Sequence, residues 1–310
     1  MIKNGTVLHM LVLYGLSDLP SLQLPLFLVF LLVYLMTLTG NLLIVLLICT
    51  DSHLQTPMYF FLGTLACLDM GYSSVTTPRM LYDLYTQNRL ISIEACITQM
   101  YFFLFFITSE IVLLAVMSYD RYVAICHPLH YIQIMHWKTC VLLVSGALTF
   151  GLIHTLPHTL LLLNLNFCSS KPLQSFFCDL PQLLQVSCSD TFFNLLLIIF
   201  CGILLGGGLF SLTFSPYIII LNTIMKIPSK GMRSKAFSTC SSHLTVVFIF
   251  HGTLFFNYFD PNAKDIRAAS VFYALITPVL NPLIYSLRNQ DLKKSLTRSL
   301  QQLKLAKNSV

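Results

Sequence analysis

The sequence predicts an all-α membrane protein, in which a bundle of seven transmembrane helices is followed by a short amphipathic helix. Of its 310 residues, 56% are hydrophobic and only 10% are charged, whereas a soluble domain carries about 25% charged residues. The mean hydropathy of +0.76 agrees with this reading. So much apolar surface exceeds what a soluble core would bury, and the lipid bilayer is its natural solvent.

Seven stretches are apolar enough, and long enough, to span a membrane, which takes roughly 20 residues. Five contain no Asp, Glu, Lys or Arg, and the other two contain one acid each, Asp69 and Glu110. We expect a single domain over residues 1–310, with an outer N-terminal segment (1–21), the seven-helix bundle (22–287) and an inner tail (288–310). The seven stretches are residues 19–50, 57–78, 97–119, 139–170, 191–225, 236–259 and 268–287.

Basic residues are unevenly divided between the two sides that seven spans create. Inner loops of membrane proteins are enriched in Lys and Arg, so the richer side, which holds the C-terminus, is expected to be cytoplasmic. The glycosylation sequon that begins at Asn4 also requires an outer N-terminus. The net charge of +6 then suits anionic membrane lipid and requires no nucleic acid. The basic residues of the inner side are Arg121, Lys138, Lys226, Lys230, Arg233, Lys235, Arg288, Lys293, Lys294, Arg298, Lys304 and Lys307, and those of the outer side are Lys3, Arg79, Arg89, Lys171, Lys264 and Arg267.

Two local patterns predict further features of the helices. After Arg288, four leucines recur at helical spacing with basic residues between them, which indicates an amphipathic helix on the inner leaflet. In the fifth stretch, Gly206–Gly208 permits either a close approach of another helix or a bend. The four leucines are Leu292, Leu296, Leu300 and Leu303.

Four of the ten cysteines fall on the expected outer side, where disulfides persist. Cys168, Cys178 and Cys188 lie in one long outer loop, residues 164–190, and Cys96 lies at the start of the third span. Four cysteines allow three pairings, and the spacing alone leaves all three open. The other six lie in spans or at the inner face and are expected to stay reduced.

The third span ends in an Asp120-Arg121 pair, which is costly at a membrane boundary unless the two charges are partnered. The pair could serve only as a helix-end anchor. It could also act as a switch, in which the ion pair holds one state and releases Arg121 in another.

The run from Met117 to Tyr131, which contains this pair, resembles the signature of the olfactory (odorant) receptors, a branch of the rhodopsin-like G-protein-coupled receptors. The remaining signatures follow in order along nearly the whole chain, and together they resemble the tetrapod-type class. They are Gly40-Asn41, Leu54 to Leu62, Leu68-Asp69, Thr77 to Leu81, Lys235 to Leu244 and Pro278 to Asn289. Three positions depart from the family pattern: Gln55 replaces the usual His, Pro216 replaces the Ser before Tyr217, and His251 replaces a Tyr.

The resemblance implies a receptor of the plasma membrane, not an enzyme, that binds small volatile ligands and activates a stimulatory, olfactory-type heterotrimeric G protein, raising cyclic AMP. It implies that Arg121, once freed from Asp120, meets the C-terminus of the G-protein α subunit. Tyr217 and Tyr285 would support the active arrangement. It further implies the disulfides Cys96–Cys178 and Cys168–Cys188.

The ligand pocket is expected between the third and sixth spans, which the resemblance places around the odorant cavity. Glu110 should face the bundle interior, because ionisable side chains in spans avoid lipid. Helical steps outward from Glu110, and from His251 in the sixth span, select the residues that share those faces. Ordinary helix packing is the competing interpretation for each apolar member. The expected pocket residues are Phe103, Leu104, Ile107, Thr108, His251, Leu254, Phe255 and Tyr258.

A polar core is expected deeper in the bundle, formed by Asn41, Asp69, Glu110 and Asn281, which the resembled fold places at one level. Two close carboxylates cannot both stay charged and dry. Either a proton neutralises one of them, or a sodium ion lies between Asp69 and Glu110 and favours the inactive state. No other cofactor is expected.

Three rival interpretations are weaker. A transporter would favour repeated halves and broken helix pairs, which the sequence lacks. An intramembrane aspartyl protease would need a second motif to partner Tyr119-Asp120, and none exists. A zinc site at Cys240 and His243 has close spacing but no second pair of ligands.

Overall fold

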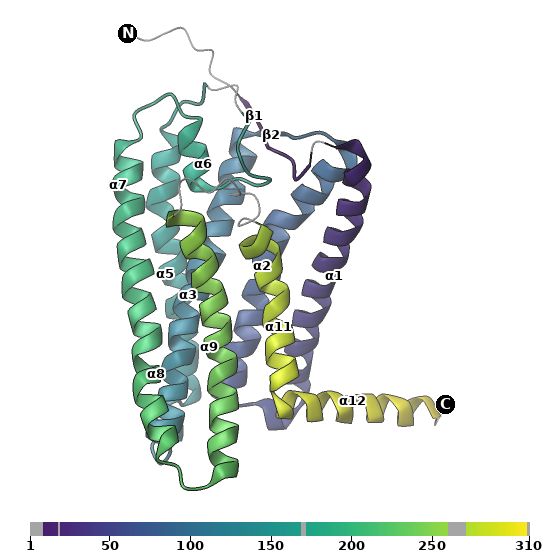
Figure 1. The fold of residues 1–310 in the computed structure, drawn as a ribbon, viewed down its shortest axis with the longest axis vertical. Helices are drawn as coiled ribbons and strands as arrows, with labels where there is room; N and C mark the ends of the chain where they lie inside the picture. The colour runs from purple at the N-terminus through teal and green to yellow at the C-terminus, as the bar shows by residue number, and fades with distance from the viewer. Residues whose placement is uncertain (1–8, 18, 169–171, 260–270, 309–310) are drawn as a thin grey trace.

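Each of the seven apolar stretches forms a long helix or helical segment in the computed structural model, which describes residues 9–308 apart from residue 18, residues 169–171 and residues 260–270. The helices run roughly parallel or antiparallel and form one bundle (Figure 1). The bundle helices are α1 (Pro20–Thr50), α2 (Pro57–Thr86), α3 (Ile93–Cys126), α5 (Trp137–Leu163), the continuous segment α7 (Phe192–Cys201), η2 (Gly202–Leu209) and α8 (Phe210–Met225), α9 (Lys230–Phe259), and η3 (Phe272–Ile276) with α11 (Thr277–Arg288). The predicted seven-helix fold is therefore confirmed within the described chain.

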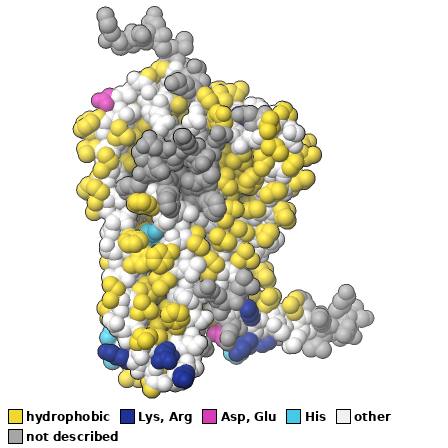
Figure 2. Space-filling model, viewed as in Figure 1, with side chains coloured by type: hydrophobic (Ala, Val, Ile, Leu, Met, Phe, Trp, Pro, Cys, Tyr) yellow, Lys and Arg dark blue, Asp and Glu magenta, His cyan; other side chains and the backbone are white. Residues whose placement is uncertain are grey.

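The flanks of the bundle are apolar, as lipid requires. Among the described helices, α1, α3, α5 and the α7–η2–α8 segment combine the length and hydropathy of membrane spans. In the last of these, Ile203, Leu212 and Ile218 are 66%, 62% and 67% exposed. Figure 2 shows such hydrophobic side chains over the flanks, whereas Lys and Arg gather at one end. An apolar surface this extensive is stable against acyl chains and not against water.

Local sequence signals explain where helices begin and end. Pro57 opens α2 at a position where its missing N–H costs no hydrogen bond. The helix ends where Gln87 takes a left-handed conformation, with φ 57°. Ser92 then caps α3, because its hydroxyl accepts from the Ala95 backbone N–H at 3.2 Å.

At the end of the bundle where α2 passes into α3, short strands and two disulfides tie the loops together. Strand β1 (Met10–Val12) pairs with β2 (Leu90–Ser92) in antiparallel register. The long loop contains a short helix, α6 (Leu180–Gln185). The bridges are Cys96–Cys178 and Cys168–Cys188, so both expected pairings are confirmed.

The fifth span departs from a regular α-helix at its glycines. Residues Gly202–Leu209 form a π-helix between α7 and α8. A side chain at Gly206, Gly207 or Gly208 would meet nothing within 4 Å. The close helix approach considered from the sequence is therefore wrong at these positions, and the glycines accommodate a wider turn of backbone instead.

The predicted amphipathic helix is confirmed as α12 (Gln290–Asn308), which follows α11 and projects sideways from the base of the bundle (Figure 1). Leu292 is buried, and Leu296 packs against the main core. Arg298 pairs with Asp51 at 2.8 Å, at the end of α1. The side chain of Tyr59 reaches Asn289 at 3.1 Å. The side chain of Tyr59 also reaches Asp291 at 3.3 Å. The start of α12 is thus tied to the first turn of α2 and to the end of α1, on either side of η1 (Ser52–Leu54).

Candidate functional site

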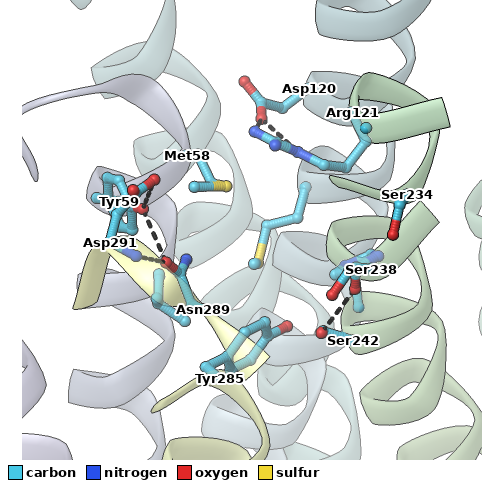
Figure 3. A pocket seen from close by; sticks show the side chains of 14 residues that line it. Met58, Tyr59, Asp120, Arg121, Ser234, Ser238, Ser242, Tyr285, Asn289 and Asp291 are labelled. Carbon is cyan, nitrogen blue, oxygen red and sulfur yellow. Dashed lines mark hydrogen bonds and ion pairs between the residues drawn. The ribbon is translucent and has the colours of Figure 1, made fainter. Parts of the chain in front are cut away.

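A cavity of about 590 Å³ opens at the end of the bundle where the basic residues gather (Figure 3). Its walls come from α2, α3, α9 and α11, and from the start of α12. In Figure 3 the serines of α9 line one wall of the cavity next to Arg121, and Tyr59, Asn289 and Asp291 lie on the wall across from those serines. The lining residues are Met58, Tyr59, Leu62, Met117, Asp120, Arg121, Gly231, Ser234, Ser238, Ser242, His243, Tyr285, Asn289 and Asp291.

Asp120 and Arg121 form the expected ion pair. Arg121 Nε donates to Asp120 Oδ2 at 3.0 Å, and Nη2 donates to the same oxygen. The other carboxylate oxygen, Oδ1, accepts from the Tyr131 hydroxyl at 2.8 Å. Tyr131 begins the short helix α4 (Tyr131–Ile134). Burial, with the charge of Asp120, raises the pKa of Tyr131, so its hydroxyl remains a donor.

The two tyrosines with expected switch roles both lie beside this region. Tyr217 is buried and hydrogen-bonded to Nδ1 of His243, a residue that lines the cavity. Pro216 lies inside α8, and this contact forms next to it. Tyr285 also lines the cavity, and its buried hydroxyl has no hydrogen-bond partner within the described chain. These contacts do not test the roles of Tyr217 and Tyr285 in activation, which remain predictions.

The polar core comes together around one amide. Asn281 Nδ2 donates to both oxygens of Asp69 at 3.0 Å and to Oε1 of Glu110 at 3.4 Å. The two acids and Asn281 are all buried. Asn41 makes different contacts: its Nδ2 donates to the carbonyls of Thr37 and Pro278 at 3.0 and 3.2 Å. Asn41 therefore joins α1 to α11, and Asn281 joins the two acids.

The expected pocket residues of α3 lie in the interior. Phe103 and Ile107 are buried in the main hydrophobic core, against which Leu104 packs. Phe103 is stacked on Tyr72, with ring centroids 5.2 Å apart. On its other side it meets Phe177 of the long loop, at 4.8 Å. Thr108 makes a different contact, because its hydroxyl lies 3.2 Å from Nδ1 of His154 on α5.

The expected pocket residues of α9 divide into two groups. Leu254 packs against the same core as Phe103. His251 faces α8, with its ring 5.6 Å from that of Phe210. Phe255 is 59% exposed and so is not enclosed by the bundle. The side chain of Tyr258 lies outside the described residues, as does Asn4. Their ligand and glycosylation roles remain predictions.

Three functional contacts were not anticipated from the sequence. Tyr131 lies within the same signature as Asp120, and this closeness in the sequence could have predicted a contact between the two side chains. Gln99 holds the long loop, because its Oε1 accepts from the Cys178 backbone N–H at 2.9 Å. The partner of Thr108, His154, carried no signal, because a histidine in an apolar run reveals neither its direction nor its neighbour.

The bundle has the fold of the rhodopsin-like G-protein-coupled receptors. Squid rhodopsin superposes with a TM-score of 0.69 over 97% of this chain and 92% of its own, at 16% sequence identity.

The chain belongs to the olfactory receptor family, whose sequence model matches residues 30–303. It is 48% identical to Olfactory receptor 1G1 of Gorilla gorilla gorilla, over 96% of both chains. It is 46% identical to Olfactory receptor 7C1 of Homo sapiens, over 96% of this chain and 94% of that one. The protein is therefore an odorant receptor of the plasma membrane, which crosses the membrane several times and is not an enzyme.

Proposed function

We propose that the receptor binds small, mostly apolar volatile ligands in its outer half and activates a stimulatory, olfactory-type heterotrimeric G protein, which raises cyclic AMP. The main support is the 590 Å³ cavity at the basic end of the bundle. Its volume and its place among the basic residues suit a peptide segment, and Arg121 on its wall is paired with Asp120.

The inactive state rests on two contacts of one carboxylate. Asp120 binds Arg121 through one oxygen and accepts from Tyr131 through the other. Opening this pair would free the guanidinium to donate hydrogen bonds to the C-terminus of the α subunit inside the cavity. The hydroxyl of Tyr285, which has no hydrogen-bond partner within the described chain, lines the same cavity on the side away from Arg121 (Figure 3). It would gain a partner in the active arrangement, which favours that state over the resting one.

The test is a screen of an odorant panel in transfected cells, with cyclic AMP as the readout. Arg121→Ala should reach the cell surface and lose the response to every agonist found. Lys138→Ala is the matched control, because Lys138 is exposed and does not line the cavity. A full response of Arg121→Ala at equal surface density, or no rise in cyclic AMP for any agonist that binds, would refute the coupling proposal.

The ligand pocket is proposed between α3 and α9, with Phe103, Ile107 and Leu254 supplying apolar surface. A site of this kind needs few polar groups to orient a ligand. Tyr258→Phe tests one of them: agonists with a polar head should lose about 1 kcal/mol, the worth of a neutral hydrogen bond. Wholly apolar agonists should be unaffected. Equal losses for both kinds would show that Tyr258 acts through packing.

The basic end of the bundle is proposed to face the cytoplasm, with α12 against the inner leaflet. The clustering of Lys and Arg at this end supports the orientation (Figure 2). Anionic lipid is the expected surface for α12, whose exposed face carries Lys293, Lys294 and Arg298.

Sodium is proposed to bind at Asp69 and Glu110. Buried carboxylate oxygens suit a hard cation, and two acids that share one amide donor need a cation or a proton between them. Replacing sodium by choline at equal ionic strength should lower the melting temperature of the purified receptor. Glu110→Gln should remove this dependence, and Glu94→Gln, an exposed acid of the same helix, should retain it. A melting temperature indifferent to sodium would leave the protonated pair.

A further inference from the structure

Two histidines of α5 and one cysteine of α7 meet in the half of the bundle that carries the disulfides. The side-chain ligand atoms of His154, His158 and Cys201 all lie within 4.8 Å of one another. Helices α5 and α7 run side by side there (Figure 1). None of these three residues belongs to the cavity, the ion-pair switch or the polar core described above.

Helix α5 packs closely against α3, and this contact sets the position of the cluster. A Cβ atom built on Gly151 would collide with the Ser109 hydroxyl and lie 3.0 Å from the Phe105 carbonyl oxygen. Only glycine permits this approach. His154 and His158 follow Gly151 by three and seven residues, so they project from the same face of α5. The close approach thus sets both rings between α3 and α7.

The contacts of His154 leave one of its ring nitrogens available to a metal. Its Nδ1 lies 3.2 Å from the Thr108 hydroxyl. Its Nε2 is buried and has no hydrogen-bond partner within the described chain. Histidines that bind metals characteristically use one ring nitrogen as the ligand while the other hydrogen-bonds to an oxygen, which fixes the tautomer and the ring plane. The Thr108 contact supplies that second interaction.

Cys201 lies where the backbone changes from α-helix to π-helix. It is the last residue of α7, and the π-helix begins at Gly202. A π-helical turn changes the direction in which adjacent side chains project, and such turns frequently occur at functional sites. The thiol is free of any disulfide and half-buried. The irregular backbone is thus placed directly beside the third ligand atom.

We propose that His154, His158 and Cys201 form a Zn²⁺ site that joins α5 to α7 beside α3. Imidazole nitrogen and thiolate sulfur are the ligands that zinc prefers, whereas hard cations favour oxygen. Three protein ligands leave the fourth tetrahedral position to water or another small donor. On binding, the Cys201 thiol releases its proton to solvent and both imidazoles remain neutral.

The geometry requires only side-chain movement. Zinc bonds of about 2.0–2.1 Å to nitrogen and about 2.3 Å to sulfur place tetrahedral ligand atoms roughly 3.3–3.6 Å apart. The observed separations of up to 4.8 Å exceed this by at most about 1.2–1.5 Å. A rotation about the χ angles of His158 and Cys201 covers such a distance. Without metal, the same rings would form a packing cluster, in which the centroids of His154 and His158 are 5.1 Å apart.

The experiment uses the full-length receptor, stripped of metal with a chelator and held in lipid nanodiscs. Zn²⁺ is titrated against a chromophoric competitor, and bound zinc per receptor is measured by elemental analysis. One tightly bound zinc is expected. Cys201→Ser and His158→Ala should each weaken it at least about 10-fold, and Thr108→Val by roughly 10-fold, as loss of an orienting partner does. Cys49→Ser and His130→Ala, both at exposed positions, should bind zinc as the unmutated receptor does.

A second measurement needs none of the cluster variants to fold. Co²⁺ replaces zinc in such sites, and a cysteine ligand gives it a sulfur-to-cobalt charge-transfer band in the near ultraviolet. That band should appear in the unmutated receptor and in Cys49→Ser. Absence of the band, or equal zinc affinity in the cluster variants and the two controls, would show that the three residues only pack against one another.

Discussion

The contact between α3 and α5 gives a prediction in which one glycine is compared with another on the same helix. Gly151 is buried, and a Cβ there would strike the Ser109 hydroxyl and lie 3.0 Å from the backbone carbonyl of Phe105. Gly146 lies on the exposed side of α5, and a Cβ there would meet nothing within 4 Å. Gly151→Ala and Gly146→Ala therefore make the same chemical change in two different surroundings.

The expected energies follow from this difference. Replacing glycine by alanine in a helix favours the helix by about 1 kcal/mol at either position. Only Gly151→Ala must also displace Ser109 and the backbone of α3, and overpacking of this kind costs about 1–3 kcal/mol. Because the helix term is common to both variants, Gly151→Ala should be less stable than Gly146→Ala by about 1–3 kcal/mol.

Thermal unfolding of the purified receptor measures this difference, with a thiol-reactive dye as the probe. The thiols of Cys140 and Cys240 are buried and become reactive as the bundle opens. Gly146→Ala should melt at or above the temperature of the unmutated receptor, and Gly151→Ala clearly below it. Equal melting temperatures for the two variants would refute the close approach of α3 and α5.

Three further predictions concern the switch, the disulfides and the topology. Tyr131→Phe removes a hydrogen bond to a charged group, worth about 1.5–3 kcal/mol, so surface-normalised basal cyclic AMP should rise, as it should in Asp120→Asn; unchanged basal signalling in both would refute the lock. Chain entropy predicts that losing Cys96–Cys178, with a separation of 82 residues, costs about 4.5 kcal/mol, against about 3.3 kcal/mol for the second bridge, with a separation of 20; melting temperatures that rank the two losses in reverse would contradict this. Asn4→Gln should abolish the mass shift produced by glycosidase, and a shift that persists would show that another residue is glycosylated.

The helices could be predicted from the sequence because a membrane span needs a long run of uncharged residues, and such a run can be recognised without knowing any contact between helices. The ion pair of Asp120 and Arg121 was also accessible, because adjacent charges at the end of a span need partners. The pairing of the four disulfide cysteines could not be predicted from spacing, and it required the family resemblance.

The contacts across helices could not be predicted, because they depend on the rotation of each helix about its axis. Phe255 shows this limit: three- and four-residue steps from His251 select it for the interior, yet its side chain is mostly exposed. A small error in the chosen face moves a residue from the core to lipid. The π-helix at Gly202–Leu209 was hidden for a related reason, since its wider turn changes the phase of every side chain that follows.

The attachment of α12 has a practical consequence for measuring motion in this receptor. Arg298 and Asn289 bind side chains of Asp51 and Tyr59, at the ends of α1 and α2 beside the cavity, so the first turns of α12 move with those two helices. A fluorophore on this part of the tail would provide a stationary reference point. A second label at the start of α9, beside the cavity, would then report the displacement of that helix alone, and the change in energy transfer could be read directly as a distance.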